Sequence, residues 1–139
     1  MRFNNWKRPT FNKQCLTKWN WMCQHYENLT LGIGCDIGAF SYLNAKYGIE
    51  IGENAQIASH VSIYSVSTID NKQGKVKIGR NARIGSHSVI MPGVTIGENS
   101  VIGSFSFVAH DVPPNVQVYG IPVSDVEKWL KACCVEARN

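Results

Sequence analysis

The chain has 139 residues, a mass of 15.5 kDa and a formal net charge of +4 at neutral pH. With 44% hydrophobic and 17% charged residues, the composition is that of a globular protein and excludes a disordered chain. The sequence contains no apolar run of the roughly 18 residues that a membrane span needs, and residues 1–9 lack the apolar stretch of a secretory signal. We therefore expect one cytoplasmic domain.

The excess positive charge lies in residues 1–28, which carry five basic side chains against the single acidic Glu27. Residues 29–139 balance nine basic against nine acidic side chains. A nucleic-acid-binding protein more often has a basic face on its folded body, so we expect no nucleic-acid partner.

Residues 12–27 show apolar side chains at helical spacing, at Cys15, Leu16, Trp19, Met22, Cys23 and Tyr26. This pattern predicts an amphipathic helix. One role for the arm and helix of residues 1–28 is a cap over an open end of the fold. The other is contact with a membrane surface through Trp6, Trp19 and Trp21.

The centre of the chain is an internal repeat with a period of six residues. Ile-Gly pairs open three similar segments, Ile51–His60, Ile78–His87 and Ile96–Phe105. The aliphatic position recurs in the second half at Ile78, Ile84, Ile90, Ile96, Ile102 and Val108. Extended backwards from Ile51, the same register gives Ala45, Ala39 and Ile33, and forwards it gives Ile57, Ile63 and Ile69.

A period of six fits neither an amphipathic helix nor a simple alternating strand, but it suits a short strand followed by a sharp corner. Three such units close a triangular coil of 18 residues, and residues 31–118 supply about five coils. The aliphatic residue should point inward, and the residue four positions later, such as Ala82 or Ser88, is small enough to fill the corner. Gly at the second position or Asn at the fourth tolerates the left-handed backbone of a corner.

The register breaks between Ile69 and Ile78, where residues 70–77 are polar and contain a glycine. We expect this stretch to leave the coil as a loop. A loop on a rigid scaffold is a common place for substrate contacts, although it can equally be a neutral insertion.

After the repeat, Ser124 and Glu127 form a capping-box pattern before an apolar stretch, which predicts a short helix over about residues 125–135. The five cysteines, Cys15, Cys23, Cys35, Cys133 and Cys134, show no zinc-binding spacing, so we expect reduced and mostly buried thiols.

The repeat resembles that of the hexapeptide-repeat acyltransferases, most specifically over residues 84–103 and through Asp111–Asn115 to Gly120–Pro122. The resemblance covers residues 29–123 and is strongest to the galactoside, serine and capsule-sugar acetyltransferase branch. It implies an all-β solenoid, a left-handed parallel β-helix, which would lie between the arm (1–28) and a C-terminal segment (124–139).

The resemblance also implies acetyl-CoA as co-substrate, bound in a groove between two subunits of a homotrimer. Carried over by position, the residues that would contact acetyl-CoA are Gly85, Ser86, Gly103, Ser104, Ala109, His110, Gly120 and Pro122. Corners of such coils favour Gly and Ser in any case, so small residues alone do not establish the groove.

Acyl transfer from a thioester to a hydroxyl benefits from a general base, and histidine suits that role. His60 and His87 both stand at the fourth position of their repeat units, and they should stack one coil apart with Phe105 as the next rung. Asp70 and the loop leave the prism within the same coil, so we also expect this carboxylate near the pair. The pair alone provides too few ligands for a metal ion, and we expect none.

The family's usual histidine lies just before the extruded loop, where this chain has Thr68 and Ile69. Either His60 or His87 has taken over as base, or an amine acceptor attacks without a protein base, or the chain is not catalytic. We therefore expect O-acetylation of a sugar in surface-polysaccharide biosynthesis, or N-acetylation of a nucleotide-linked amino sugar. Serine and other acceptors, and a non-catalytic scaffold, remain alternatives.

Overall fold

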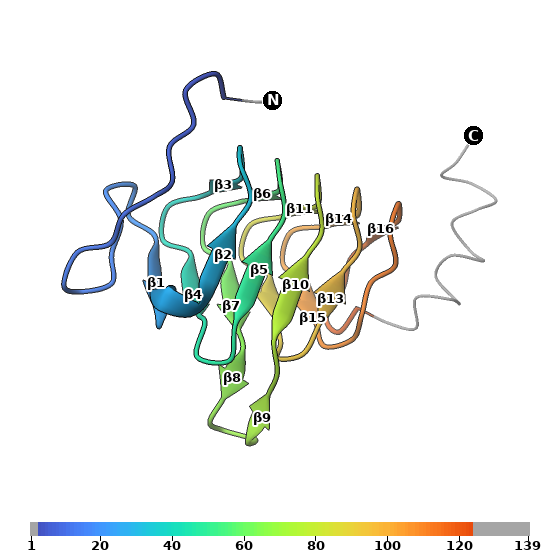
Figure 1. Cartoon of the computed structure of the whole chain (residues 1–139). Helices are drawn as coiled ribbons and strands as arrows, with labels where there is room; N and C mark the ends of the chain where they lie inside the picture. Colours follow the sequence, from blue (N-terminus) through green and yellow to red (C-terminus); the bar gives the residue numbers. More distant parts are fainter. Residues whose placement is uncertain (1–2, 124–139) are drawn as a thin grey trace.

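A computed structural model describes residues 3–123 as a parallel β-solenoid of about five turns, with one sheet on each side of a triangular prism (Figure 1). Sheet A contains β1 (Met22–Gln24), β4 (Tyr42–Asn44), β7 (Ser62–Tyr64), β12 (Val89–Ile90) and β15 (Phe107–Val108). Sheet B contains β2 (Leu29–Leu31), β5 (Ile49–Ile51), β10 (Val76–Ile78) and β13 (Thr95–Ile96). Sheet C contains β3 (Asp36–Ile37), β6 (Gln56–Ile57), β11 (Arg83–Ile84), β14 (Val101–Ile102) and β16 (Gln117–Val118).

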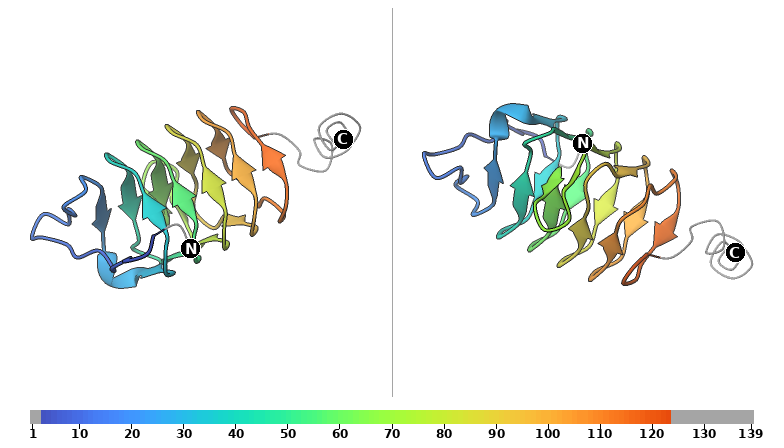
Figure 2. Two further views of the ribbon diagram at one scale, coloured as in Figure 1. Left: turned by 90° about the horizontal axis from the view of Figure 1, so that it is seen from above. Right: turned by 90° about the horizontal axis from the view of Figure 1, so that it is seen from below.

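The chain visits sheets B, C and A in turn, so successive coils stack along the prism axis (Figure 2). Parallel pairing aligns equivalent residues, as in the column of Ile57, Ile84 and Ile102 inside the prism. These three side chains are at most 2% exposed, and the small corner residues Ala82 and Ser88 are fully buried. The predicted inward positions of the second half are thus confirmed.

The register predicted for the first half is wrong before Ile51. Leu31 pairs with Ile51 and Ile37 pairs with Ile57, so this coil is 20 residues long rather than 18. The additional residues lie between β4 and β5, and Leu31, not Ile33, points inward. Ile33 is 51% exposed and Ile69 is 97% exposed, because both fall outside the inward column.

At the corners between sheets B and C and between sheets C and A, the chain turns at the fourth residue of a repeat unit, where φ is positive even for large side chains such as Phe40 and His60. The glycine at the second position has a different purpose. A Cβ added to Gly79 would lie 2.5 Å from the backbone nitrogen of Glu98, and one added to Gly85 would lie 2.5 Å from that of Ser104. These glycines therefore allow close stacking of the coils, and the left-handed backbone predicted for them occurs at the fourth position instead.

The predicted N-terminal helix is wrong, since residues 12–27 contain turns, strand β1 and the start of a 3-10 turn, η1 (Tyr26–Asn28). The Asn12 side chain accepts hydrogen bonds from the backbone of Gln14 and Leu16, and Cys15 and Asn20 have positive φ, which interrupts a helix. The edge of sheet A instead receives β1 in parallel with β4. The segment still covers the first coil, with Trp21 only 2% exposed.

The predicted loop is a hairpin that leaves the prism between sheets A and B (Figure 1). Its strands are β8 (Val66–Ser67) and β9 (Lys72–Gln73), which pair antiparallel. The extruded part begins earlier than predicted, and it ends before Val76 and Lys77, which belong to β10. Val76 is fully buried, which anchors the return of the chain into the prism.

The C-terminal helix predicted over residues 125–135 lies outside the described residues, as do Cys133 and Cys134. Cys15, Cys23 and Cys35 are free thiols, and the last two are buried as expected. Over residues 3–123, no helix is long and apolar enough to cross a membrane.

Candidate active site

Four aromatic rings stack along the corner between sheets C and A, and we call this row the ring corner. The rings of His60 and His87 lie face to face, with centroids 4.6 Å apart and planes 11° apart. Phe105 stacks on His87 at 4.9 Å, and Phe40 lies 5.2 Å from His60 on the other side. The predicted stack of the two histidines with Phe105 is confirmed.

The backbone holds the rings in place while their edges remain in solvent. The backbone N–H of His60 donates to the carbonyl of Ala39 at 3.0 Å, and that of Phe105 donates to Ser86 at 2.9 Å. Both imidazoles are exposed. A ring fixed by stacking and open at its edge can accept a proton from a bound hydroxyl, which a general base requires.

Phe40 is a member of the row that the sequence analysis missed. It is the fourth residue of the unit that begins at Ile37, as His60 is of the unit that begins at Ile57, and its φ is 65°. The register chosen for the first coil was displaced by two residues and hid this equivalence. A register that begins at Leu31 would have found it.

Asp70 does not join the histidine pair within the chain. His60 precedes β7 whereas the hairpin follows it, so the two lie at opposite ends of that strand. Asp70 instead lies 3.7 Å from Lys72, and a hydrogen bond with the Ser67 side chain lowers the pKa of its carboxyl. The expectation that Asp70 neighbours the pair is therefore wrong, because the loop leaves the prism at the next corner.

Several residues predicted to contact acetyl-CoA line one groove on the outer face of sheet C. The groove has a volume of about 480 Å³, and its walls include Gly85, Gly103 and Ser104. Ser86 and Ser104 directly precede His87 and Phe105, so the end of the groove meets the ring corner. Asp36 and Arg83 supply charge to its walls.

The remaining predicted contacts lie elsewhere on the last coils. The Gly120 carbonyl accepts from the backbone of Phe107, which holds Gly120 near the ring corner. Pro122 is joined to Ile121, the residue after Gly120, by a cis peptide bond. Ala109 and His110 follow β15, at the far edge of sheet A from Phe105, and the fold does not bring them to the groove.

Other reactive groups do not converge on this site. Burial raises the pKa of Cys23 to about 12 and that of Cys35 to about 11, so both remain protonated thiols near neutral pH. Within residues 3–123, no group of three or more His, Cys, Asp or Glu side chains is arranged to hold a metal ion.

Comparison with known proteins agrees with this geometry. The family model described as bacterial transferase hexapeptide (six repeats) matches residues 75–110, and the model for the hexapeptide repeat of succinyl-transferase matches residues 29–65. Together they cover more than half of the chain. The chain belongs to the hexapeptide-repeat transferase family.

Among curated proteins, the chain is 46% identical over 85 residues to the galactoside O-acetyltransferase of Escherichia coli, an alignment that covers 55% of this chain and 42% of that protein. It is 35% identical over 95 residues to the serine acetyltransferase of Bacillus subtilis, covering 64% and 43% of the two chains. The chain thus spans less than half the length of both relatives.

A solved structure has a similar fold. The hexapeptide-repeat containing acetyltransferase VCA0836 of Vibrio cholerae, complexed with acetyl coenzyme A, matches with a TM-score of 0.71 and 27% identity. The match covers 75% of this chain and 62% of that one.

Proposed function

We propose that this chain is an acetyl-CoA-dependent acetyltransferase whose acceptor is a sugar hydroxyl in surface-polysaccharide biosynthesis. The observation that carries the proposal is the ring corner, where two exposed imidazoles are held at the end of a groove whose walls include Gly85, Gly103 and Ser104. The likeness to an acetyltransferase complexed with acetyl coenzyme A and to a galactoside O-acetyltransferase supports the same activity.

In this proposal, acetyl-CoA lies along the groove past Gly85, Ser86, Gly103 and Ser104 and supplies the acetyl group as a thioester. The lack of side chains at the glycines lets the cofactor arm approach the backbone. His60 takes the proton of the acceptor hydroxyl on an imidazole nitrogen as the oxygen attacks the acetyl carbon. The same imidazolium then gives the proton to the departing thiolate, so that the base is regenerated.

His87 supports His60 in this arrangement, because its ring covers one face of the His60 imidazole at 4.6 Å and limits rotation of that ring. His87 also stands beside Ser86 and could accept the proton in place of His60. Asp70, on the hairpin, could reach an acceptor only from the other edge of sheet A.

N-acetylation of a nucleotide-linked amino sugar is the second candidate, favoured by the side chains of the hairpin. The family's usual position for a histidine holds Thr68 and the 97% exposed Ile69. A neutral amine is a stronger nucleophile than a hydroxyl and needs less help from a base.

We also propose that the chain works in the cytoplasm as a homotrimer that packs through sheet A. The outward row on sheet A runs through the partly buried Met22, Tyr42, Ser62, Val89 and Phe107. The corresponding row on sheet B contains Thr30, Glu50, Lys77 and Thr95 and is polar throughout. An apolar row is the more favourable one to bury against another subunit, and light scattering during gel filtration would measure the assembly.

The activity is tested by release of free thiol from acetyl-CoA in the presence of hexosides, nucleotide-linked amino sugars or serine. Turnover with hexosides is expected. Turnover confined to amino sugars would replace the first proposal with the second, and turnover confined to serine would reject both. Absence of thiol release and of coenzyme A binding would show that the chain is a non-catalytic scaffold.

A further inference from the structure

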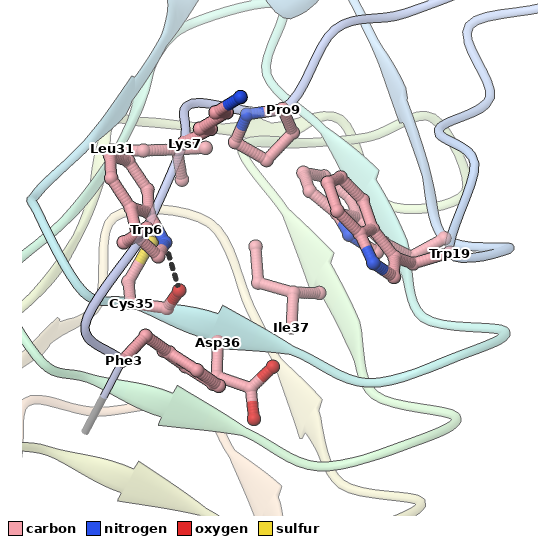
Figure 3. Close-up of a pocket in the computed structure, with 10 residues that line it drawn as sticks. Phe3, Trp6, Lys7, Pro9, Trp19, Leu31, Cys35, Asp36 and Ile37 are labelled. Carbon is pink, nitrogen blue, oxygen red and sulfur yellow. Dashed lines mark hydrogen bonds between the residues drawn. The ribbon is translucent and has the colours of Figure 1, made fainter.

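A second cavity, separate from the ring corner, lies between the N-terminal arm and the first coil of sheet C (Figure 3). We call it the arm pocket, and its volume is about 340 Å³. Trp6 forms one side and Trp19 the other, with Ile37 between them. Asp36 and Lys7 provide charged groups at its two ends.

The walls of the arm pocket are held by contacts of their own. The indole N–H of Trp6 donates to the Cys35 carbonyl at 2.8 Å, which fixes that ring against the first coil. Trp21, which also lines the pocket, is 2% exposed and meets Phe11 edge to face at 5.4 Å. The ammonium of Lys18 lies 4.6 Å from the Trp19 ring centroid. The pocket is therefore formed before any ligand arrives.

The mixture of groups identifies the chemistry of a ligand. The face of an indole carries negative charge density and attracts the polarised C–H groups on one face of a sugar ring. A carboxylate and an ammonium at the edges can accept from and donate to the ring hydroxyls. An acyl chain would place hydrocarbon against the Asp36 carboxylate and the Lys7 ammonium and displace water from both charges, which is costly.

We propose that the arm pocket binds a pyranose ring, between Trp6 and Trp19 and with its hydroxyls toward Asp36 and Lys7. The volume lies within the range of about 300–1,000 Å³ that is usual for small-molecule sites. Asp36 lines both the arm pocket and the groove on sheet C, so the two cavities meet at this residue.

The contact between the arm pocket and the groove at Asp36 gives the pocket a role in acceptor binding, and this step rests on the proposed function. A sugar held in the arm pocket lies at the first-coil end of the groove whose other walls include Gly85 and Gly103. The pocket then holds the acceptor sugar, or a neighbouring sugar unit of an oligosaccharide acceptor. It selects acceptors that carry a pyranose over serine.

Binding is measured on the full chain without coenzyme A, by titration calorimetry and saturation-transfer NMR with maltose and methyl β-galactopyranoside as probes. Trp19→Ala should weaken binding about tenfold. Because Trp19 is 46% exposed, its removal leaves the core intact. Trp19→Phe should restore most of the affinity, and Asp36→Asn should weaken binding with little change of shape.

The matched control is Tyr47→Ala, which removes a 40% exposed ring that also lies under a lysine ammonium but outside the pocket. It should bind both probes as the unsubstituted chain does. Absence of pyranoside binding, or equal binding by the Trp19→Ala variant, would overturn the proposal. Binding to anionic lipid vesicles, without pyranoside binding, that is lost with Trp19→Ala would also overturn it in favour of a membrane contact.

Thiol release separates this inference from the proposed function. Pyranoside binding that depends on Trp19, without acetyl transfer, would support the pocket and reject the acetyltransferase. Acetyl transfer to a hexoside with an unchanged KM in the Trp19→Ala variant would support the enzyme and reject the pocket as its acceptor site.

Discussion

Two corners of the prism share one backbone conformation but carry different side chains. At the corner between sheets B and C, the fourth residue is Gly34 in the first coil and then Asn54, Asn81, Asn99 and Asn115, with φ of the asparagines between 58° and 62°. At the ring corner the equivalent residues are Phe40, His60, His87 and Phe105, with φ between 59° and 65°. Asparagine adopts this backbone readily, whereas other residues with a Cβ lose roughly 1–2 kcal/mol each.

The asparagine corner is explained by stability alone. The Asn81 side chain donates to Asn99 at 3.2 Å, and Asn99 donates to Asn115 at 3.2 Å, so the amides form a ladder down the prism. At the ring corner, two stacked pairs and one tilted pair contribute about 0.5–1.5 kcal/mol each. That gain at best offsets the backbone cost of four residues, so stability does not account for the rings. The proposed function supplies another reason for two of the four rings, since it makes the His60 imidazole, supported by that of His87, the general base.

The largest predicted effect tests what the two corners have in common, the close stacking of coils. Gly79→Ala, before the asparagine corner, and Gly85→Ala, before the ring corner, each place a Cβ 2.5 Å from backbone of the next coil. Each should lower the free energy of unfolding by about 3 kcal/mol, measured by urea denaturation. The control is Gly93→Asn, where φ is 80° and no atom lies within 4 Å of the added Cβ. A loss as large at Gly93 would show that backbone conformation, not coil spacing, dominates.

The second prediction tests the base role that is proposed for His60 at the ring corner. His60→Ala should reduce turnover with a hexoside at least about tenfold, because the acceptor proton loses its base. The assembly measured by light scattering should not change, since the exposed His60 ring packs against the exposed rings of Phe40 and His87. His87→Ala, measured beside it, distinguishes the two imidazoles. Unchanged turnover in the His60→Ala variant would reject His60 as the base.

The ring corner also shows how far the sequence alone could go. The stacking of His60 on His87 could be predicted, because a period of six fixes which residues share a corner even across the hairpin. The register extended from Ile51 did not place Phe40 in the row, because two additional residues between β4 and β5 shift the first coil. Ile33 then falls at a position that the repeat predicts to be inward. The position predicted for Asp70 is wrong because His60 lies at the corner before β7, whereas the hairpin leaves the prism at the corner after it.

The helix predicted over residues 12–27 is wrong for a different reason. Its apolar spacing fits a helix, but Trp21 and Cys23, two positions apart, are the residues that become buried. The open edge of sheet A offers backbone hydrogen-bond partners to a strand, and this tertiary gain outweighs a local helical pattern. The arm pocket follows from that outcome and could not be foreseen from residues 12–27 read as a helix.

The third prediction weakens the asparagine corner without touching the proposed chemistry. Asn99→Ala removes two side-chain hydrogen bonds and leaves a Cβ at a φ of 61°. The free energy of unfolding should fall by about 1–2 kcal/mol. Asn99→Gly keeps the backbone relaxed and should cost less than half as much. Acetyl transfer by either variant should match the unsubstituted chain, and a parallel loss of turnover would contradict the division of roles between the corners.

The smallest predicted effect on stability concerns the corner between sheets A and B, where the hairpin leaves the prism. Lys75 forms an ion pair with Glu50 there. Its hydrogen bond to Glu50 lowers the pKa of that carboxyl from its ordinary value, so the pair stabilises the fold at pH values above that ordinary pKa. The contribution is lost as pH falls through the lowered pKa of the folded state. Because both side chains are more than 40% exposed, Glu50→Gln should cost under about 1 kcal/mol in urea denaturation at neutral pH. The difference should disappear in acid, and a cost that persisted there would assign Glu50 a packing role instead.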